Sequence, residues 1–366
     1  MTQERNTPNF PKADWKQNEL EWLEACPICF SSRSQPLHTG IEDFIFSAAS
    51  GKWNLIKCNA CSGIYLNPRP TRKTIGRAYS NYYTHSASAS ENQPLSSLQW
   101  IRRATANGYR NRLYGTKLHP SLGHVGSAAA FFSRRFRNAI ETEAAGLVGV
   151  RPTKRGVSAI LDVGCGSGLT LKRARDAGWR VMGIEPDPNA VIAAAENGVE
   201  IIASDVTELS QQFNGTFERI LLNHVIEHVH DPLAMLKRCK ELLLPSGSLW
   251  LETPNSASVG HEEFGLDWRG LEPPRHLFIF ELTSIERLLK EAGFTRISVS
   301  EPRDVIRYMF ERSLYIRNMR RESAGGEASN TSNHPALSLE DLIKENRERV
   351  SAHPNQSEFI TLEATA

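Results

Sequence analysis

The chain has 366 residues, enough for two domains or one enlarged domain with a sizeable buried core. Its 43 Lys and Arg residues nearly balance 41 Asp and Glu residues, so the overall charge does not indicate a protein that binds polyanions. The N-terminal residues carry no apolar segment, and no apolar run reaches the roughly 18 residues of a membrane-spanning helix. We therefore expect a cytoplasmic protein without a secretory signal or a membrane span.

Two Cys-x-x-Cys pairs follow a polar tail at residues 1–20. They are formed by Cys26, Cys29, Cys58 and Cys61. Four thiolates on two tight turns suit the tetrahedral coordination of Zn²⁺, and such a closed site leaves no open position for catalysis. A redox function would need a thioredoxin-like βαβ context, which the region lacks, and disulfides are not expected in a reducing cytoplasm. The pattern predicts a structural zinc ribbon within residues 21–84, with a β-hairpin at about residues 41–56.

Residues 85–150 are predicted to form a polar linker and a helical lid. From residue 158 onward, strands and helices alternate regularly within a core at residues 151–301. The expected strands are 158–164, 180–185, 199–203, 217–223 and 247–253, followed by 294–301. The expected helices are 168–177, 188–197, 231–243 and 283–292.

The C-terminal part extends beyond a minimal domain of this kind. Residues 302–357 are predicted to be an insertion, with helices at 303–321 and 339–350 on either side of a disordered polar stretch at 322–338. A terminal strand is expected at 358–363, within the terminal segment 358–366. The arginine-rich helices are interpreted as solvated faces rather than as a nucleic-acid site.

A glycine-rich turn follows the first core strand, in the run Ile-Leu-Asp-Val-Gly-Cys-Gly-Ser-Gly at 160–168. Glycines allow the backbone to approach a ligand closely, because a Cβ atom would clash or forbid the required dihedral angles. The spacing is G-x-G-x-G and not the G-x-G-x-x-G that binds a pyrophosphate. An acidic residue, Glu185, ends the next apolar run. The arrangement therefore favours a ligand with an adenosine and an amino acid but no phosphate.

Four segments in this order resemble the motifs of the class I methyltransferases that use S-adenosylmethionine. They lie at 162–168, 183–187, 203–206 and 222–232. The resemblance implies an α/β fold with a Rossmann-like, doubly wound sheet of seven strands whose last strand is antiparallel, here with an N-terminal four-cysteine zinc ribbon and helical insertions. The ribbon and the run Leu-Asn-Pro-Arg-Pro at 66–70 also resemble zinc-ribbon methyltransferases of bacterial polysaccharide and secondary-metabolite biosynthesis.

The motifs imply the cofactor contacts. Glu185 is expected to accept hydrogen bonds from both ribose hydroxyls, because an ionised acceptor is needed at the end of the second strand. Asp205 is expected near the adenine amino group, and Val206 is expected to donate its backbone N–H to the ring. Asp162 is expected under the methionine moiety, where it holds the glycine turn or the amino group. The full expected set is Asp162, Gly164, Cys165, Gly166, Gly168, Glu185, Asp205, Val206, Asn223 and His224.

Three interpretations compete for the group that removes a proton from the methyl acceptor. In the first, a neutral histidine, His276 or His224, takes the proton. In the second, His224, Glu227, His228 and His276 bind a divalent metal ion that positions substrate hydroxyls. This set is similar to the Glu-x-x-Glu-His site of small-RNA 2′-O-methyltransferases and some quinone O-methyltransferases, but His224 stands where those families place the first glutamate. In the third, these residues only cap helices and pack around the pocket.

The loop at 265–270 and the run Glu-Pro-Pro-Arg-His-Leu-Phe at 272–278 are expected on the acceptor side of the pocket. Trp268 would stack on a sugar or an aromatic ring, and Arg269 or Arg275 would bind a phosphate or a carboxylate. The alternative is that these loop residues are packing anchors.

The sequence thus predicts an enzyme that transfers a methyl group from S-adenosylmethionine, by in-line displacement with a histidine base, to an oxygen of a sugar, a glycan precursor or another small metabolite. One alternative is an RNA methyltransferase whose zinc ribbon and basic helices bind the nucleic acid, but no dense basic and aromatic patch is present. Another alternative is a non-catalytic module that binds the cofactor and recruits a partner. The intact glycine and acidic motifs argue against that module.

Overall fold

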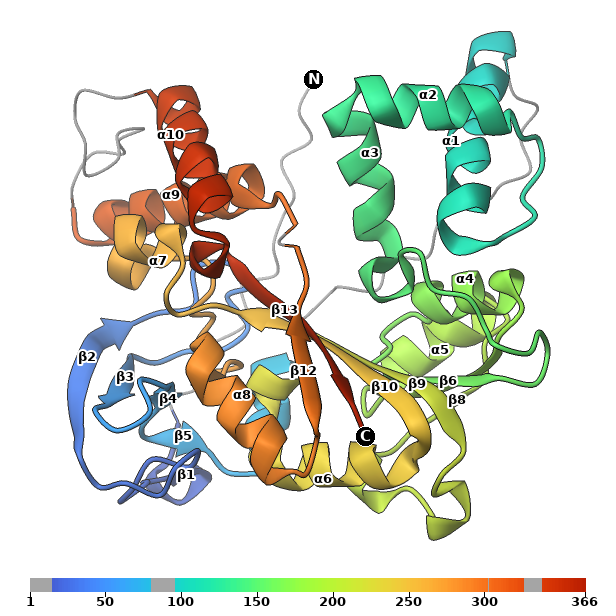
Figure 1. Ribbon diagram of the computed structural model, residues 1–366. Coiled ribbons are helices and arrows are strands. Elements are labelled where there is room, and N and C mark those ends of the chain that lie inside the picture. Colours follow the sequence, from blue (N-terminus) through green and yellow to red (C-terminus); the bar gives the residue numbers. More distant parts are fainter. Residues whose placement is uncertain (1–14, 80–95, 302, 326–337) are drawn as a thin grey trace.

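The computed structural model describes residues 15–79, 96–301, 303–325 and 338–366 (Figure 1). The first part of the predicted tail, residues 85–95 of the predicted linker, and most of the polar stretch predicted at 322–338 lie outside the described residues.

The N-terminal segment forms two small antiparallel sheets. One contains β1 (Leu20–Glu21) and β5 (Arg69–Pro70). The other contains β2 (Ser34–Ile41), β3 (Trp53–Cys58) and β4 (Ile64–Leu66), and its order is β11-β4-β3-β2. The predicted hairpin is confirmed as the β2–β3 pair, and it begins earlier than expected because residues 34–36 already pair with 56–58. The fourth strand, β11 (Phe278–Ile279), comes from a distant part of the chain.

The core sheet has seven strands in the order β12-β13-β10-β9-β6-β7-β8 (Figure 1). The strands are β6 (Ala159–Val163), β7 (Arg180–Ile184), β8 (Ile201–Ile202), β9 (Phe217–Asn223), β10 (Leu243–Pro254), β12 (Arg296–Val299) and β13 (Phe359–Thr365). Strand β13 runs antiparallel to both of its neighbours, β10 and β12, and the five strands from β10 to β8 are parallel. The predicted fold class, with its antiparallel last strand, is confirmed.

Alternating side chains on the central strands supply two separate cores, since successive residues of a strand point to opposite faces. Ile160, Leu221 and Trp250 pack on one face, in a cluster with residues of α4 (Leu169–Ala177). Leu161 and Leu222 belong to the other cluster, with residues of α6 (Pro232–Leu242) and α8 (Leu282–Glu291). Helices therefore cover both faces, and this explains why every residue of β6 is buried.

The remaining helices connect strands or form two groups beside the sheet (Figure 1). Helix α5 (Pro188–Glu196) follows β7, and α1 (Ser97–Tyr114), α2 (Gly123–Phe132) and α3 (Arg134–Glu141) form the helical region that precedes the core (Figure 1). On the other side, α7 (Val259–Phe264), α9 (Ile306–Ser323) and α10 (Leu339–Ala352) pack together. Among the helices that the structure describes, none is both long and apolar enough to cross a bilayer.

Candidate cofactor and active site

The glycine turn follows β6, leads into α4 and is hydrogen-bonded to the end of β7. Gly164 has a φ of +67° and donates its N–H to the carbonyl of Ile184 over 2.8 Å. A Cβ atom on Gly164 would lie 2.7 Å from Cγ2 of Val225, so neither the conformation nor the space admits a larger residue. Gly168, with a φ of +72°, is the N-cap of α4. The turn predicted from the motif is therefore built as expected, around Cys165 and Gly166.

The carboxylate of Glu185 is oriented by backbone donors directly after β7. Its Oε2 accepts the N–H of Gly166 over 2.9 Å, and its Oε1 accepts the N–H of Asp187 over 3.0 Å. Each carboxylate oxygen keeps a further lone pair for a ligand. The residue is half-buried, so part of its surface remains exposed at the strand ends. Glu185 thus offers a fixed anionic acceptor beside the glycine turn.

Asp162 lies buried beneath this turn, with 4% of its surface exposed. Burial, with a smaller contribution from the charge of Glu185, raises the pKa of Asp162 to about 7. Burial first, and then the charges of Asp162 and Glu185, raise the pKa of the Cys165 thiol, so the thiol stays protonated.

The other expected cofactor residues end the neighbouring strands. Asp205 caps the short 3₁₀ helix Val206–Glu208, and its Oδ1 accepts the N–H of Thr207 over 2.8 Å. Val206 is buried. Asn223 is the exposed last residue of β9, next to the glycine turn because β9 pairs with β6. The structure therefore brings all the expected cofactor residues to the carboxyl ends of the parallel strands.

His224 and Glu227 follow β9 in a strained loop. His224 has a φ of +54°, and its ring contacts Phe359 edge-on at 4.6 Å between centroids. Its Nδ1 lies 3.3 Å from Oε1 of Glu227, and its Nε2 lies 3.3 Å from Oε1 of Glu252. Both nitrogens of His224 thus lie near buried carboxylates.

Glu227 is fully buried in the 3₁₀ helix Ile226–His228, and its Oε2 accepts the hydroxyl of Thr253 over 3.0 Å. Burial alone would raise the pKa of Glu227, but the hydrogen bond from His224 and the neighbouring imidazoles lower this pKa to about 2. Glu227 is therefore an anion at neutral pH.

His228 and His276 face each other, with ring centroids 4.7 Å apart. Nδ1 of His228 lies 3.0 Å from the carbonyl oxygen of Arg275, and Nδ1 of His276 lies 2.8 Å from that of Gly270. Since a carbonyl can only accept, both protons are assigned to Nδ1, and each Nε2 keeps a lone pair. Burial lowers the pKa of His276 to about 4 despite the nearby charge of Glu272, so this imidazole is neutral.

Glu227, His228 and His276 each place a ligand atom within 4.8 Å of the other two. Two imidazoles and one carboxylate are a ligand set that divalent transition metals accept. Of the four residues in the metal interpretation, three converge, while His224 does not belong to this group. The donor set fits a divalent cation.

The segment that carries His276 is held by the N-terminal ribbon. Arg275 is fully buried, and its guanidinium donates to both oxygens of Asp43 over 3.0 Å each. Its Nη1 also donates to the carbonyl of Ala78 over 3.0 Å. The next residue but one, Leu277, donates its N–H to the carbonyl of Glu227 over 2.7 Å and accepts the N–H of Leu66 over 3.0 Å. The residues on both sides of His276 are therefore bonded to the ribbon, and Leu277 is also bonded to the core.

The expected acceptor contacts are not borne out for Trp268 and Arg275. Trp268 is 1% exposed, and its indole N–H donates to Oε2 of Glu358 over 2.8 Å, so it is a packing anchor. Arg275 is committed to Asp43 and to Glu272. Arg269 is half-buried and pairs with Glu272. Sequence reasoning missed Asp43, Glu272 and Tyr79, whose hydroxyl lies 3.0 Å from Nδ1 of His228.

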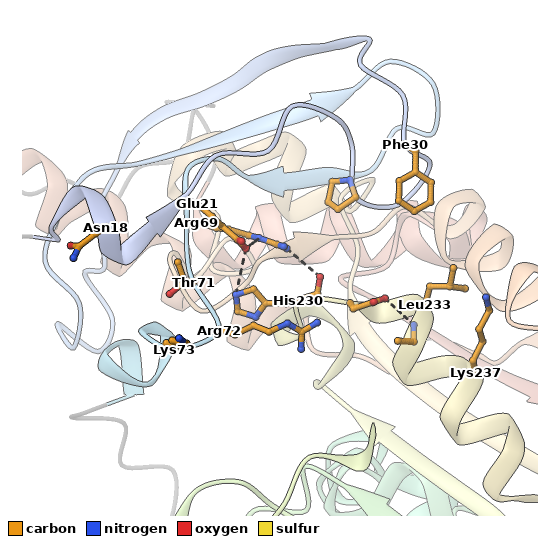
Figure 2. A pocket seen from close by; sticks show the side chains of 13 residues that line it. Asn18, Glu21, Phe30, Arg69, Thr71, Arg72, Lys73, His230, Leu233 and Lys237 are labelled. Carbon is orange, nitrogen blue, oxygen red and sulfur yellow. Dashed lines mark hydrogen bonds and ion pairs between the residues drawn. The ribbon is translucent and has the colours of Figure 1, made fainter. Parts of the chain in front are cut away.

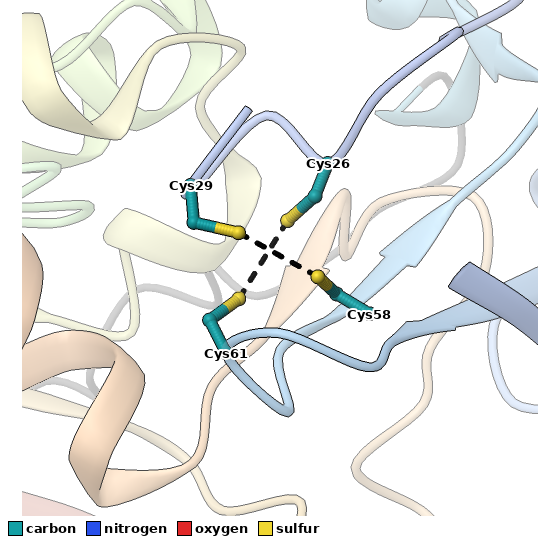
Figure 3. Close-up of side chains that lie close together, drawn as sticks. All are labelled: Cys26, Cys29, Cys58 and Cys61. Atoms are coloured by element: carbon teal, nitrogen blue, oxygen red, sulfur yellow. Dashed lines mark hydrogen bonds between the residues drawn. The ribbon is translucent and has the colours of Figure 1, made fainter. Parts of the chain in front are cut away.

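The four ribbon cysteines converge as predicted (Figure 3). The sulfurs of Cys26 and Cys61 are 3.7 Å apart, and those of Cys29 and Cys58 are 3.5 Å apart. A tetrahedral zinc with Zn–S bonds of about 2.3 Å requires sulfurs about 3.8 Å apart, close to these distances. The described cysteines form no disulfide. The donor set fits a structural Zn²⁺.

Comparisons with known proteins agree with this geometry. Residues 132–299 match the model of a family described as "Methyltransferase domain". Among curated proteins, the chain is 37% identical over 128 residues to a ubiquinone biosynthesis O-methyltransferase of Haemophilus ducreyi, covering 32% of this chain and 51% of that protein. It is 34% identical over 102 residues to the protein of the same name from Xanthomonas oryzae pv. oryzae strain PXO99A, covering 26% of this chain and 43% of that one. The chain thus spans about half the length of the curated relatives it matches.

Among solved structures, a SAM-dependent methyltransferase from Archaeoglobus fulgidus covers 66% of this chain and 98% of its own, with 18% identity and a TM-score of 0.41. The segment matched by the family model contains the glycine turn, Glu185 and the loop after β9. This segment is therefore similar to a methyltransferase domain, in agreement with the motifs.

The raised pKa of Asp162 leads to a prediction about stability. The native state binds this proton more tightly than the unfolded chain, whose Asp has a pKa of 3.8, so the contribution is present below about pH 4 and is lost as the pH rises through about 7. Asp162→Asn should therefore flatten the dependence of the free energy of unfolding on pH across this range. Urea unfolding at several pH values measures this dependence. The control is Asp176→Asn on α4, and equal slopes in wild type and Asp162→Asn would contradict the assignment.

Proposed function

We propose that the protein transfers the methyl group of S-adenosylmethionine to a hydroxyl oxygen of a small acceptor. The observation that carries this proposal is the Glu185 carboxylate, held by the N–H groups of Gly166 and Asp187 beside the glycine turn. Its remaining lone pairs suit the two ribose hydroxyls, and Asp162 beneath the turn suits the ammonium of the methionine moiety. The left-handed backbone of Gly164 and Gly166 lets the turn form beside Glu185.

The names of the relatives support oxygen as the methyl acceptor, since both are called O-methyltransferases. The acceptor that we propose is a sugar, a glycan precursor or another small metabolite. In the reaction the bond between sulfur and methyl breaks as the bond between the acceptor oxygen and methyl forms, which leaves S-adenosylhomocysteine. The acceptor's proton must then move to a basic group of the protein.

His276 is the base that we propose. Its Nδ1 is fixed by the carbonyl of Gly270, so its Nε2 lone pair is available for the hydroxyl proton. The imidazolium that forms would lie near two carboxylates, because Nε2 is 3.8 Å from Oε2 of Glu272 and Glu227 is close by. These anions stabilise the charge after proton transfer. His224 is the weaker candidate, because both of its nitrogens already lie near buried carboxylates.

A second candidate mechanism uses a divalent metal ion, and the convergence of Glu227, His228 and His276 favours it. Both Nδ1 atoms are oriented by backbone carbonyls, as is common for metal-binding imidazoles. Such an ion would lower the pKa of a bound hydroxyl. In that case His276 would be a ligand rather than a base.

The position of the ribbon supports a structural role over nucleic-acid binding. Its strand β4 pairs with β11, and its Asp43 holds Arg275. These contacts stabilise the segment that carries His276. The ribbon is therefore proposed to be part of the active-site scaffold.

The cofactor assignment predicts the effect of Glu185→Ala. Loss of two charge-assisted hydrogen bonds to the ribose should weaken S-adenosylhomocysteine binding by about a hundredfold or more. Isothermal calorimetry measures this affinity, and Glu196→Ala, at an exposed position of α5, is the control with the same loss of charge. Wild-type affinity in Glu185→Ala would remove the assignment.

The base and the metal mechanisms predict different responses to a chelator. With His276 as the base, His276→Ala should lower transfer of labelled methyl groups into a metabolite extract by about 10²–10⁴-fold without changing S-adenosylhomocysteine affinity. Any transfer that EDTA removes by stripping the ribbon zinc should then return with Zn²⁺ and not with Mg²⁺ or Mn²⁺ alone. With a metal, EDTA should abolish transfer and added Mg²⁺ or Mn²⁺ should restore it. Unchanged transfer in His276→Ala would contradict both.

A further inference from the structure

A cavity of about 700 Å³ lies between the ribbon and α6, and no part of the proposed reaction uses it (Figure 2). One wall comes from the ribbon, with Phe30 and Arg69, and from the residues directly after β5, with Arg72 and Lys73. The opposite wall is the first part of α6, with Lys237. Two separate parts of the fold thus enclose this space.

Positive charge dominates the lining. Arg69, Arg72, Lys73 and Lys237 contribute four cations, against the carboxylates of Glu21 and Asp231. Both carboxylates are engaged within the protein. Oε1 of Glu21 accepts Nε–H of Arg69 over 2.7 Å, and Oδ1 of Asp231 accepts the N–H of Ala234 over 2.9 Å.

The remaining cations lack anionic partners. Arg72, Lys73 and Lys237 form no ion pair with any residue in the described ranges. Burial is the largest cause that lowers the pKa of His230, another residue of the lining, and the charges of Arg69 and Arg72 add to it.

Hydrogen bonds and a cation–π contact connect the residues at the floor of the cavity. Arg69 is 6% exposed, its Nη1 lies 3.4 Å from the carbonyl oxygen of His230, and its guanidinium lies over the ring of Phe278 at 5.6 Å. Nε2 of His230 donates to the carbonyl of Pro70 over 2.9 Å. Figure 2 shows Arg72 beside this floor, with Phe30 and Lys237 toward the other end. Phe30 is 69% exposed and forms an apolar rim.

We propose that this cavity binds the phosphate or pyrophosphate group of a phosphorylated ligand, attracted by the positive charge that Arg72 and Lys237 contribute to its lining. Cations from two elements suit a compact multivalent anion better than a single carboxylate. Phe30 and Leu233 offer apolar surface to the part of the ligand next to the phosphate. The ligand is either the methyl acceptor itself, in which case the site rests on the proposed function, or a separate phosphorylated metabolite.

The test uses calorimetry with inorganic pyrophosphate on the full-length protein saturated with S-adenosylhomocysteine. We expect binding that weakens with added salt, and a loss of about tenfold or more in affinity for Arg72→Glu and for Lys237→Glu. Lys344→Glu, on the exposed side of α10, changes the net charge equally and should leave the affinity unchanged. Circular dichroism and S-adenosylhomocysteine binding confirm that each variant folds.

The proposal is overturned if pyrophosphate does not bind, or if Arg72→Glu and Lys237→Glu bind it as tightly as the wild type does. Pyrophosphate that binds only without S-adenosylhomocysteine would lie in the cofactor cleft, which also overturns it. Failure of S-adenosylhomocysteine to bind would affect only the proposed function, so the two failures are distinguishable.

Phosphatase treatment of the methylated product shows whether the bound phosphate belongs to the methyl acceptor or to a separate ligand. If the acceptor carries it, methyl transfer into a metabolite extract yields a labelled product that phosphatase alters, and pyrophosphate inhibits the transfer. If the ligand is separate, phosphatase leaves the labelled product unchanged while pyrophosphate still binds the protein. Either result supports the site.

Discussion

The buried ion pair between Arg275 and Asp43 is the interaction on which the geometry of the proposed active site depends. It joins a loop of the ribbon to the segment that carries His276, across 232 positions of sequence. Both side chains are almost fully buried, so loss of either partner would leave an uncompensated charge, at a cost of about 3–5 kcal/mol. The pairing of β4 with β11 adds backbone hydrogen bonds to the same connection. The ribbon is therefore part of the catalytic scaffold that we propose and not an appended module.

The proposed cofactor half of the site is built differently, from the core sheet alone. Parallel pairing of β6 with β7 and β9 brings Gly164, Glu185 and Asn223 to one edge. No residue of the ribbon is needed for this arrangement. Cofactor affinity and proton transfer should consequently respond to different parts of the chain, with the core governing the first and the ribbon the second.

The sequence alone predicted the features that depend on local pattern. Alternation of strands and helices, the glycine turn and the cysteine spacing each depend on neighbouring residues, and the structure has all of them. The functions of Trp268 and Arg275 depend on partners far away, Glu358 and Asp43, and no local signal reveals such partners. Strand β11 was missed for the same reason, since two residues, Phe278 and Ile279, form a strand only because β4 lies beside them.

The central claim is that the ribbon, through Asp43, holds the segment around His276. The most direct measurement is hydrogen exchange of residues 272–279 in Asp43→Asn, together with its zinc content and S-adenosylhomocysteine affinity. The control is Glu262→Gln, which breaks an exposed pair with Arg349. We predict faster exchange in this segment and reduced methyl transfer, with one zinc per chain and cofactor affinity unchanged. Exchange and transfer equal to those of the wild type would contradict the account.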